Sequence, residues 1–414
     1  MPGDPRPARR WSLCWLLFAA TALSFLDRQV LSVLAPTITK EFSLSSEAYS
    51  RVLFAFQASY TVMFALGGRL VDVLGTRIGM AACIGVWSLA SAAHSLVRNG
   101  LMLGAARFLL GVGEGGCFPA ATKGAAEWFP AEGRALAMGV ATGGSALGAV
   151  IAPPLVAWAG ARLGWRMAFQ MTGLLGAIWL AIWMAIAPKK PKAAIDAPRM
   201  PVITWISQPS VLWILFARFL FDPVFYFYMF WIPQYLSKER HMSVAQIGSS
   251  FWIPFLVLGV SQVLGGRVSD LLVKRGWEPV RARRVVLGAA AFLTPASWLA
   301  ALTSQAEWAI VLMCVLMFAH GFWITNFLGL VGDFYPREAI GTITGLTGTA
   351  GGIGGMLSSL AIGAAVDRFS FTPVFAVSGI LYPLAFAAIL MATSRRKSPR
   401  LAEPPASPTR SIAI

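Results

Sequence analysis

The sequence predicts an all-α membrane protein with twelve transmembrane helices in two six-helix repeats. Of its 414 residues, 57% are hydrophobic and only 13% are charged, whereas soluble domains carry about 25% charged residues. Apolar stretches of the ~20 residues needed to cross a bilayer recur along the chain. Backbone polar groups in lipid must be satisfied within their own segment, so each stretch is predicted to be a helix. The predicted spans are residues 12–37, 48–71, 78–97, 101–120, 134–160, 166–187, 207–236, 244–269, 285–303, 307–333, 340–366 and 372–393.

The chain repeats itself at an interval of about half its length. The letters GGRLVD at residues 67–72 return as GGRVSD at 265–270, and WFP at 128–130 returns as FYP at 334–336, each before a glycine-rich span. Two parallel six-helix repeats around a central site are a transporter architecture. The predicted divisions are an N-terminal bundle at 1–187, a cytoplasmic linker at 188–206, a C-terminal bundle at 207–393 and a cytoplasmic tail at 394–414.

The net charge of +16 could indicate nucleic-acid binding, but the distribution of the charge argues against it. Most Lys and Arg residues fall on the side that the two termini share, which places both termini in the cytoplasm of a multi-pass inner-membrane protein. The basic clusters are then expected to contact anionic lipid and not nucleic acid. The first span is not predicted to be a cleaved signal peptide, because its apolar stretch continues to Pro36. We expect a monomer.

No catalytic or metal-binding pattern accompanies the predicted spans. The four cysteines, Cys14, Cys83, Cys117 and Cys314, fall inside spans without the spacing of metal ligands. A Ser/His/Asp set, a metal cluster and a phosphate-binding loop are also missing from the sequence pattern. We therefore expect no cofactor, no metal and no enzymatic activity.

Six ionisable side chains lie inside the predicted spans, three of them cationic and three anionic. A charge at the centre of a bilayer costs about 3 kcal/mol even on insertion scales, so each such residue is a functional-site hypothesis. Three arginines suggest an anionic cargo, and three carboxylates suggest that protons travel with it. The six residues are Asp27, Arg28, Arg107, Glu114, Arg218 and Asp222.

Several segments within about residues 10–393 resemble the motifs of one protein family. The sequence GRLVDVLGTR at 68–77 resembles the loop between the second and third helices of the major facilitator superfamily. RFLLGVGE at 107–114, Phe118-Pro119 and LDR at 26–28 resemble the fourth and first helices of its anion:cation symporter branch. The motifs that resemble the hexuronate transporters of this branch are FDP at 221–223, WIPQYL at 231–236, DFYP at 333–336 and the glycine run at 345–355.

The fourth predicted helix carries Arg107 and Glu114 on one face, two turns or about 10 Å apart. That separation is too long for a direct pair in a straight helix, so the partner of each is either substrate or the pair Asp27 and Arg28. The planar guanidinium of Arg107 suits a carboxylate. A carboxyl group removed from water favours its neutral form, which makes Glu114 the proton carrier. The alternative is a structural ion-pair network between the first and fourth helices.

Asp27 and Arg28 are adjacent and therefore point about 100° apart around their helix. The resemblance implies that Asp27 is a protonation site and that Arg28 serves the substrate. It also implies that Tyr60, on the second helix, lines the cavity. Without the resemblance, Tyr60 is equally well explained as a packing residue.

The seventh predicted helix carries Arg218 and Asp222 four residues apart, hence on one face, and Pro223 is expected to bend it there. They are either a local ion pair or the contribution of the second half to the site. Tyr226 shares the face of Asp222 and is a candidate contact for a sugar ring. His320 and Asn326 in the tenth span are candidate partners for sugar hydroxyls, although a lone histidine in an apolar helix is more often a packing residue.

The glycine-rich fifth and eleventh spans are expected to pack closely against other helices, as small residues allow in membranes. Five charged residues lie at predicted cytoplasmic helix ends, where ion pairs and helix-end interactions are expected to hold an inward gate. They are Asp72, Arg77, Arg134, Asp270 and Arg337.

The balance of the six charges within the spans predicts proton coupling. The set is neutral when every group is ionised, so a bound monoanion leaves a charge of −1 that one proton cancels. We therefore expect proton-coupled symport of a sugar-acid anion such as a hexuronate. The alternatives are symport of an aldonate such as galactonate or of another small carboxylate, organic-anion antiport, and a sugar-acid sensor without transport.

Overall fold

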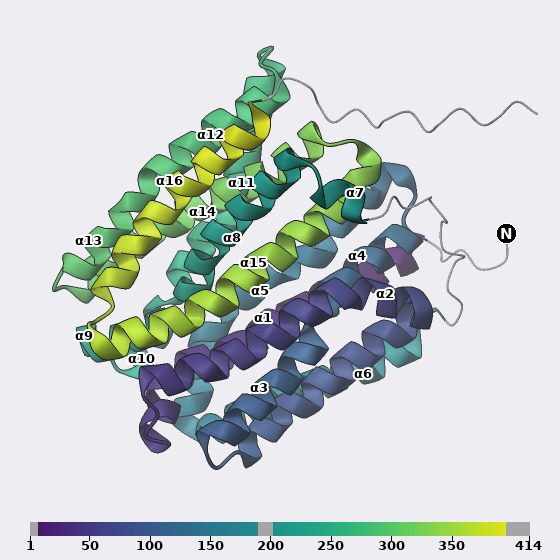
Figure 1. Cartoon of the computed structure of the whole chain (residues 1–414). Coiled ribbons are helices and arrows are strands. Elements are labelled where there is room, and N and C mark those ends of the chain that lie inside the picture. Colours follow the sequence, from purple (N-terminus) through teal and green to yellow (C-terminus); the bar gives the residue numbers. More distant parts are fainter. Residues whose placement is uncertain (1–6, 189–201, 395–414) are drawn as a thin grey trace, which may run out of the picture.

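A computed structural model describes residues 7–188 and 202–394 of the chain, and within these residues the regular elements are all helices. Most of the predicted linker and nearly all of the predicted tail lie outside the described residues. Figure 1 shows the long helices running in roughly one direction, with the first half of the chain on one side and the second half on the other. The predicted all-helical membrane fold is confirmed.

The first half makes six crossings with six helices. The helices are α1 (Pro7–Glu41), α2 (Ser46–Ala93), α3 (Gly100–Gly115), α4 (Cys117–Trp128), α5 (Ala131–Leu163) and α6 (Trp165–Ile186). The 48 residues of α2 are enough for two crossings, and they are divided at Gly75, where φ is 74° and ψ is 156°. Glycine adopts such a positive φ without a Cβ clash. The fourth crossing combines α3 and α4, which meet at Gly116.

The second half begins with the short helix α7 (Val202–Ile206) and also makes six crossings. The first three crossings are pairs of helices, and the last three are single helices. The pairs are α8 (Pro209–Phe230) with α9 (Ile232–Arg240), α10 (Val244–Ser250) with α11 (Trp252–Lys274), and α12 (Pro279–Leu293) with α13 (Ser297–Leu302). The single helices are α14 (Ala306–Phe334), α15 (Arg337–Arg368) and α16 (Thr372–Thr393).

We call the end of the bundle at which α1 begins and α16 ends the terminal face, and the opposite end, with residues 42–45 and 241–243, the loop face. The two halves meet along α1, α2 and α5 of the first half and α8, α11 and α15 of the second. Helix α15 packs against both α2 and α8, so it links the halves (Figure 1).

Glycines allow this close approach, as expected for the eleventh span. A Cβ atom at Gly351 of α15 would overlap the Asp222 carboxylate on α8, and one at Gly352 would overlap the Thr61 hydroxyl on α2. The backbone of α15 therefore lies directly against polar side chains from both halves.

Hydrogen bonds join the two halves toward the loop face. The Ser32 hydroxyl donates to the Met229 carbonyl at 2.6 Å, and the Tyr49 hydroxyl donates to the Phe230 carbonyl at 3.1 Å. About two turns beyond Tyr49 on α2, the Ser359 hydroxyl donates to the Gln57 side chain at 2.9 Å. These bonds hold α1 and α2 against the second half.

A carboxylate of the second half also caps a helix of the first half. Asp367, near the end of α15, accepts the backbone N–H of Ser46 at 2.9 Å and that of Glu47 at 2.7 Å. These amides lie in the first turn of α2, whose N–H groups lack partners within the helix. Lys238 donates to the Ser46 hydroxyl at 3.0 Å. The first turn of α2 is therefore held by two charged residues of the other half.

Candidate functional site

The most deeply buried ion pair joins α1 to α3. Arg28 Nε donates to Glu114 Oε2 at 2.6 Å, and the Ser24 hydroxyl donates to the same oxygen at 3.1 Å. The two charged side chains are 4% and 0% exposed. Glu114 can reach α1 because α3 lies tightly on α2, where a Cβ atom at Gly111 would overlap Ser59 and the Phe56 carbonyl. Of the two partners that the sequence left open for Glu114, the structure places Arg28 against it.

Aromatic rings surround the Arg28 guanidinium. Its Cζ atom lies 4.3 Å from the ring centre of Tyr60 and 4.8 Å from that of Phe25, which are cation–π distances. Tyr226 of the second half stacks on Phe230 at 5.9 Å, and Phe230 lies 6.1 Å from Phe56, which stacks on Tyr60 at 5.8 Å. A series of ring contacts therefore connects Tyr226 to the ring that lies over Arg28, where the two halves face each other.

Asp27 faces the interior of the first half, away from Arg28. Its Oδ1 atom accepts a hydrogen bond from the Ser91 hydroxyl at 2.8 Å, and Ser91 is also 2.8 Å from the Thr172 hydroxyl. Asp27 Oδ2 has no hydrogen-bond partner among the described residues. The adjacent residues thus serve different neighbours, as their separation of about 100° around the helix requires.

Arg107 is buried without a direct counter-ion. Its guanidinium Cζ lies 5.9 Å from the ring centre of Phe56 and 5.6 Å from that of Phe169. Asp27 and Glu114 act on it electrostatically, yet its Nε and Nη2 atoms form no hydrogen bond with any described residue. A buried charge normally has a partner. Arg107 therefore retains donors that can bind an anion.

Arg218 and Asp222 form the local pair that their spacing predicts. Arg218 Nε donates to Asp222 Oδ2 at 2.8 Å, and the two side chains are 18% and 9% exposed. The guanidinium lies 5.4 Å from the ring centre of Phe221. Tyr226, one turn beyond Asp222, stacks on Phe230 at 5.9 Å. The pair thus accounts for the presence of Arg218 in the membrane, while a role in binding substrate stays a prediction.

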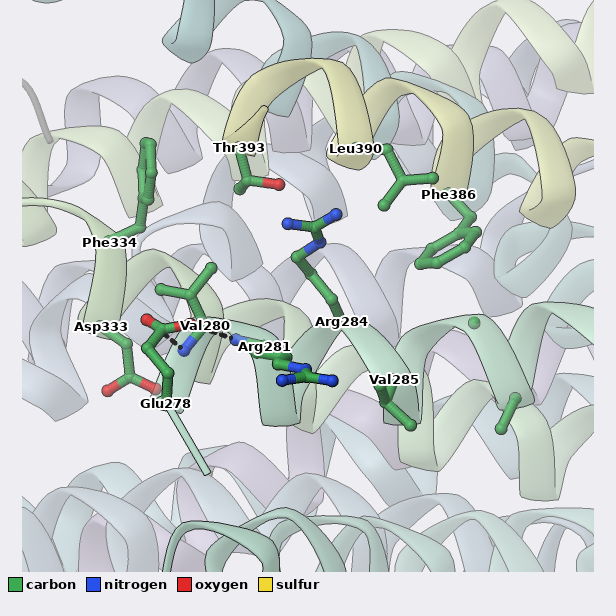
Figure 2. Close-up of a pocket in the computed structure, with 12 residues that line it drawn as sticks. Glu278, Val280, Arg281, Arg284, Val285, Asp333, Phe334, Phe386, Leu390 and Thr393 are labelled. Carbon is green, nitrogen blue, oxygen red and sulfur yellow. Dashed lines mark hydrogen bonds between the residues drawn. The ribbon is translucent and has the colours of Figure 1, made fainter. Parts of the chain in front are cut away.

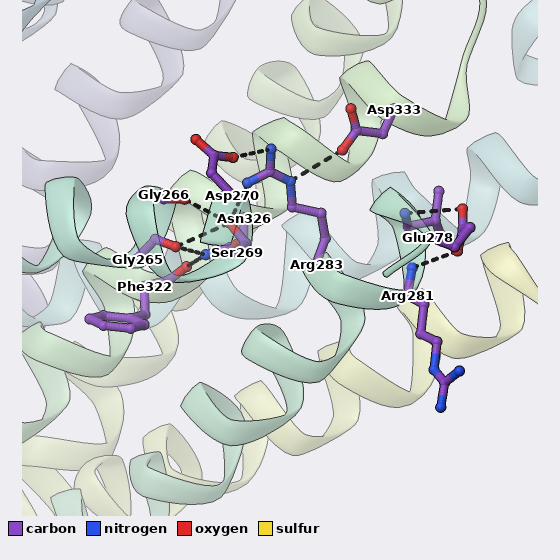
Figure 3. A network of polar contacts seen from close by, with 11 residues as sticks. Gly265, Gly266, Ser269, Asp270, Glu278, Arg281, Arg283, Phe322, Asn326 and Asp333 are labelled. Atoms are coloured by element: carbon purple, nitrogen blue, oxygen red, sulfur yellow. Dashed lines mark hydrogen bonds and ion pairs between the residues drawn. The ribbon is translucent and has the colours of Figure 1, made fainter. Parts of the chain in front are cut away.

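His320 and Asn326 are both engaged with other protein groups. His320 Nδ1 lies 2.5 Å from the Tyr382 hydroxyl, and its ring stacks on Phe225 at 4.9 Å. The Asn326 amide donates to the carbonyls of Gly265 at 3.0 Å and Phe322 at 2.8 Å, which ties α14 to α11 (Figure 3). Both side chains thus have partners that the sequence did not reveal, and a contact with substrate stays a prediction for each.

Three of the predicted gate residues contact described residues of their own half. Asp72 pairs with Lys123 at 2.8 Å, and Arg77 donates to the Met184 carbonyl at 2.5 Å. Asp270 pairs with Arg283 at 3.1 Å (Figure 3). These contacts brace helix ends inside each half, and the gate role itself stays a prediction.

Two further predicted gate residues, and one residue that was not predicted, lie at the terminal face. Arg134 Nε is buried without a hydrogen-bond partner among the described residues, and the side chain of Arg337 lies outside the described part. Arg283, which the sequence did not single out, also pairs with Asp333 at 3.1 Å and so joins α11, α12 and α14 (Figure 3). Its position one helix beyond the repeated GGRVSD motif was the available signal.

His94 is a buried residue that the sequence reasoning missed. It lies at the end of the third crossing and is fully buried. Its Nδ1 is 2.7 Å from the Ala90 carbonyl, and its ring stacks on Phe169 at 4.5 Å, the same ring that lies beside Arg107. His94 and Ser91 are polar residues at the end of an apolar span, and this position was the feature of the sequence that could have identified them.

The fold and these buried charges define a multi-pass membrane transporter of the secondary type and not an enzyme. The family model of the Major Facilitator Superfamily matches residues 17–359. The chain belongs to the Major Facilitator Superfamily, which confirms the family that the sequence motifs predicted.

Relatives with assigned names agree with this membership. The hexuronate transporter of Escherichia coli (strain K12) is 31% identical over 392 residues, which cover 90% of this chain and 91% of that protein. The galacturonate transporter of Dickeya chrysanthemi is 32% identical over 285 residues, or 64% of this chain and 83% of that protein. A bacterial homolog of the human lysosomal transporter Spinster, solved in an inward-facing and occupied conformation, has the same fold, with a TM-score of 0.73, 17% identity and coverage of 94% and 96%.

Proposed function

We propose that this protein is a proton-coupled symporter of a sugar-acid anion, with a hexuronate as the preferred substrate. Relatives named as hexuronate and galacturonate transporters align with most of the chain. An organic anion as cargo agrees with the three arginines that lie within the spans, two of which are buried. The positive-inside distribution of Lys and Arg supports an inner-membrane location with cytoplasmic termini.

The single observation that carries the proposal is the unpaired guanidinium of Arg107. It is 1% exposed, and its Nε and Nη2 atoms lack hydrogen-bond partners among the described residues. A carboxylate matches the planar fork of a guanidinium with two parallel hydrogen bonds. Anion binding at Arg107 would thus satisfy a buried charge that the described residues leave without a hydrogen-bonded counter-ion.

The Arg28–Glu114 pair supports the coupling of protons to the anion. A substrate carboxylate that binds Arg28 competes with Glu114 for the same guanidinium. Once separated from Arg28, the Glu114 carboxylate would be a buried negative charge, which is costly unless it takes up a proton. Anion binding and protonation therefore favour each other. Asp27 is proposed as a second protonation site.

The net charge of the loaded transporter decides how the membrane potential affects uptake. Moving a bare anion into a cell with a negative interior costs about 2.3 kcal/mol per 100 mV. One proton per monoanion removes that cost, and two protons let the membrane potential drive accumulation. The proposed cycle exposes the site to each side of the membrane in turn, with Arg28, Arg107 and Tyr60 from the first half and Tyr226 from the second as proposed substrate contacts.

Transport by purified protein in proteoliposomes tests this proposal. We expect glucuronate or galacturonate uptake to rise with an inward proton gradient and to be accompanied by proton entry. Voltage-independent exchange without proton flux would contradict symport and favour antiport. A thermal-shift screen of uronates, aldonates, aldarates and small carboxylates comes first, and stabilisation by aldonates alone would replace the hexuronate assignment. Stabilisation by uronates without any flux would identify a sensor.

A further inference from the structure

A groove on the outer surface of the second half lies at the terminal face, away from the central site. It has a volume of about 950 Å³ and lies between α12 and α16, next to the end of α14. Figure 2 shows the side chains that line it. One end carries Arg281 and Arg284, and the other is walled by apolar side chains such as Phe386 and Ala289. The groove therefore combines a cationic end with an apolar channel.

The guanidinium groups of the two arginines can donate hydrogen bonds to a ligand. Arg284 is half-buried, and no hydrogen bond or ion pair joins it to another described residue. Its side chain extends from α12 toward α16, into the part of the groove that Thr393 and Leu390 border (Figure 2). Arg281 is exposed, and its guanidinium lies 5.0 Å from the ring centre of Trp277. Within the described part of the chain, neither guanidinium forms an ion pair with a carboxylate.

The two acidic residues that line the groove are already engaged. The Glu278 carboxylate caps α12 by accepting the backbone N–H of Val280 at 3.1 Å and that of Arg281 at 2.8 Å. Asp333 accepts a hydrogen bond from Arg283 Nε at 3.1 Å. Arg283 thus offsets the charge of Asp333, and the two arginines of the lining outweigh the one remaining carboxylate, Glu278. The resulting net positive charge favours an anionic ligand.

The lining of the groove changes along α12 from charged to apolar residues. Tryptophan is enriched at the membrane–water interface, and Trp277 lies just before α12, beside Arg281. Arg284 is less than two turns into the helix, where a long side chain can reach the headgroup level. Gly288 lies one further turn, about 5.4 Å, toward the bilayer centre. Charge at the interface is thus followed by an apolar channel that runs inward.

We propose that this groove binds an anionic phospholipid, with its phosphate on Arg284 and Arg281 and an acyl chain between α12 and α16. Basic pockets between transmembrane helices bind anionic headgroups in this way. Gly288 keeps the channel open, because a Cβ atom there would lie 2.9 Å from the Phe386 ring. The site is independent of the proposed transport cycle and lies in the leaflet on the side of the termini.

Lipid binding to the purified full-length protein tests the proposal by native mass spectrometry in detergent. The probes are dioleoyl phosphatidylglycerol, dioleoyl phosphatidylcholine, dihexanoyl phosphatidylglycerol and inorganic phosphate. Arg284→Gln should weaken dioleoyl phosphatidylglycerol binding about fivefold, since one basic residue near the surface contributes about 1 kcal/mol. Arg275→Gln removes the same charge at the same face but outside the groove, and should leave that affinity unchanged.

Further arms separate the lipid from other sources of phosphate and from general surface charge. Ala289→Trp places a ring in the apolar channel and should weaken binding of the dioleoyl lipid while sparing the dihexanoyl lipid. Equal losses in Arg284→Gln and Arg275→Gln, or equal affinity for the two dioleoyl lipids, would overturn the proposal. Inorganic phosphate that displaces the lipid at micromolar concentration would assign the site to free phosphate. Unchanged unfolding temperatures in delipidated detergent confirm that the variants fold.

Discussion

At the scale of single residues, Glu114 is the carboxylate that would lose its ion-pair partner, Arg28, to the proposed substrate. Its Oε2 atom accepts hydrogen bonds from Arg28 and Ser24, while its Oε1 atom has no partner among the described residues. The side chain is therefore held on one oxygen and can take up a proton on the other. An amide of the same shape keeps the hydrogen bonds but cannot exchange a proton.

Glu114→Gln should accordingly retain substrate exchange and lose accumulation driven by a proton gradient. The measurement is counterflow and pH-driven uptake of the same radiolabelled hexuronate in proteoliposomes. Glu47→Gln is the control, because Glu47 is an exposed acid at the loop face whose ion-pair partner among the described residues is the exposed Arg51. If Glu114→Gln still concentrates substrate like the unmodified protein, the assignment of the proton site to Glu114 is wrong.

A substitution at Arg107 distinguishes two roles for this residue, namely binding of substrate and membership of a structural ion pair. Charge-assisted hydrogen bonds contribute about 1.5–3 kcal/mol each, so Arg107→Ala should weaken hexuronate binding at least tenfold. The same change removes a buried charge without a counter-ion, so the unfolding temperature should stay the same or rise. Arg218→Ala is the comparison, because it leaves Asp222 without its partner and should lower the unfolding temperature. Destabilisation by Arg107→Ala would instead indicate a structural ion pair.

At the scale of helices, α15 tests how closely the two halves must approach. Gly351 and Gly345 lie on the same helix, and substitution by Ala gives each the same gain of up to about 1 kcal/mol in helix propensity. A Cβ atom at Gly351 would overlap the Asp222 carboxylate, whereas one at Gly345 would have open space within 4 Å. The two substitutions therefore differ in packing and not in backbone preference.

Gly351→Ala should reduce the initial rate of hexuronate uptake at least tenfold, because it pushes Asp222 away from Arg218 or α15 away from α8. Gly345→Ala should transport at close to the rate of the unmodified protein. The measurement is uptake normalised to the amount of protein in the membrane. Equal rates in the two variants would show that close packing of α15 on α8 is not required for transport.

The helices were predictable because hydrophobic length is a local property, and so was the Arg218–Asp222 pair, whose members share one helix face. The breaks at Gly116, Trp231 and Phe251 were not predicted, because apolar composition continues through each break. Tertiary partners were also hidden. The sequence left Asp27, Arg28 and substrate open as partners of the fourth helix, and only the packing of α3 on α2 selects Arg28 for Glu114. The partners of His320 and Asn326 lie on other helices, beyond the reach of spacing arguments.

At the scale of the whole molecule, contacts between the halves are found toward the loop face. The bonds from Ser32, Tyr49 and Asp367 all lie there. Near the terminal face, a Cβ atom added at Gly139 of α5 or at Gly341 of α15 would meet nothing within 4 Å. This arrangement is what alternating access requires of a state that is closed at one face. In the proposed cycle, the bonds at the loop face break when the site opens there.

Of these contacts between the halves, those of Asp367 are the simplest to remove by a single substitution. Its carboxylate supplies both acceptors, and its partners are backbone amides of the other half, which stay unchanged. Loss of a helix N-cap costs about 1 kcal/mol, so Asp367→Ala should raise the ratio of loop-face-open to loop-face-closed molecules about fivefold. Spin labels at Leu101 and Leu302, exposed residues at the loop face in opposite halves, report that ratio by pulsed electron paramagnetic resonance with Cys314 replaced by Ser.

Two further variants serve as controls. Asp367→Asn still presents an accepting oxygen and should restore part of the closed population. Glu307→Gln changes an acid on α14 near the same face and should leave the ratio unchanged. An unaltered distance distribution in Asp367→Ala would show that the cap does not hold the halves together, and the remaining bonds from Ser32 and Tyr49 would have to carry that role.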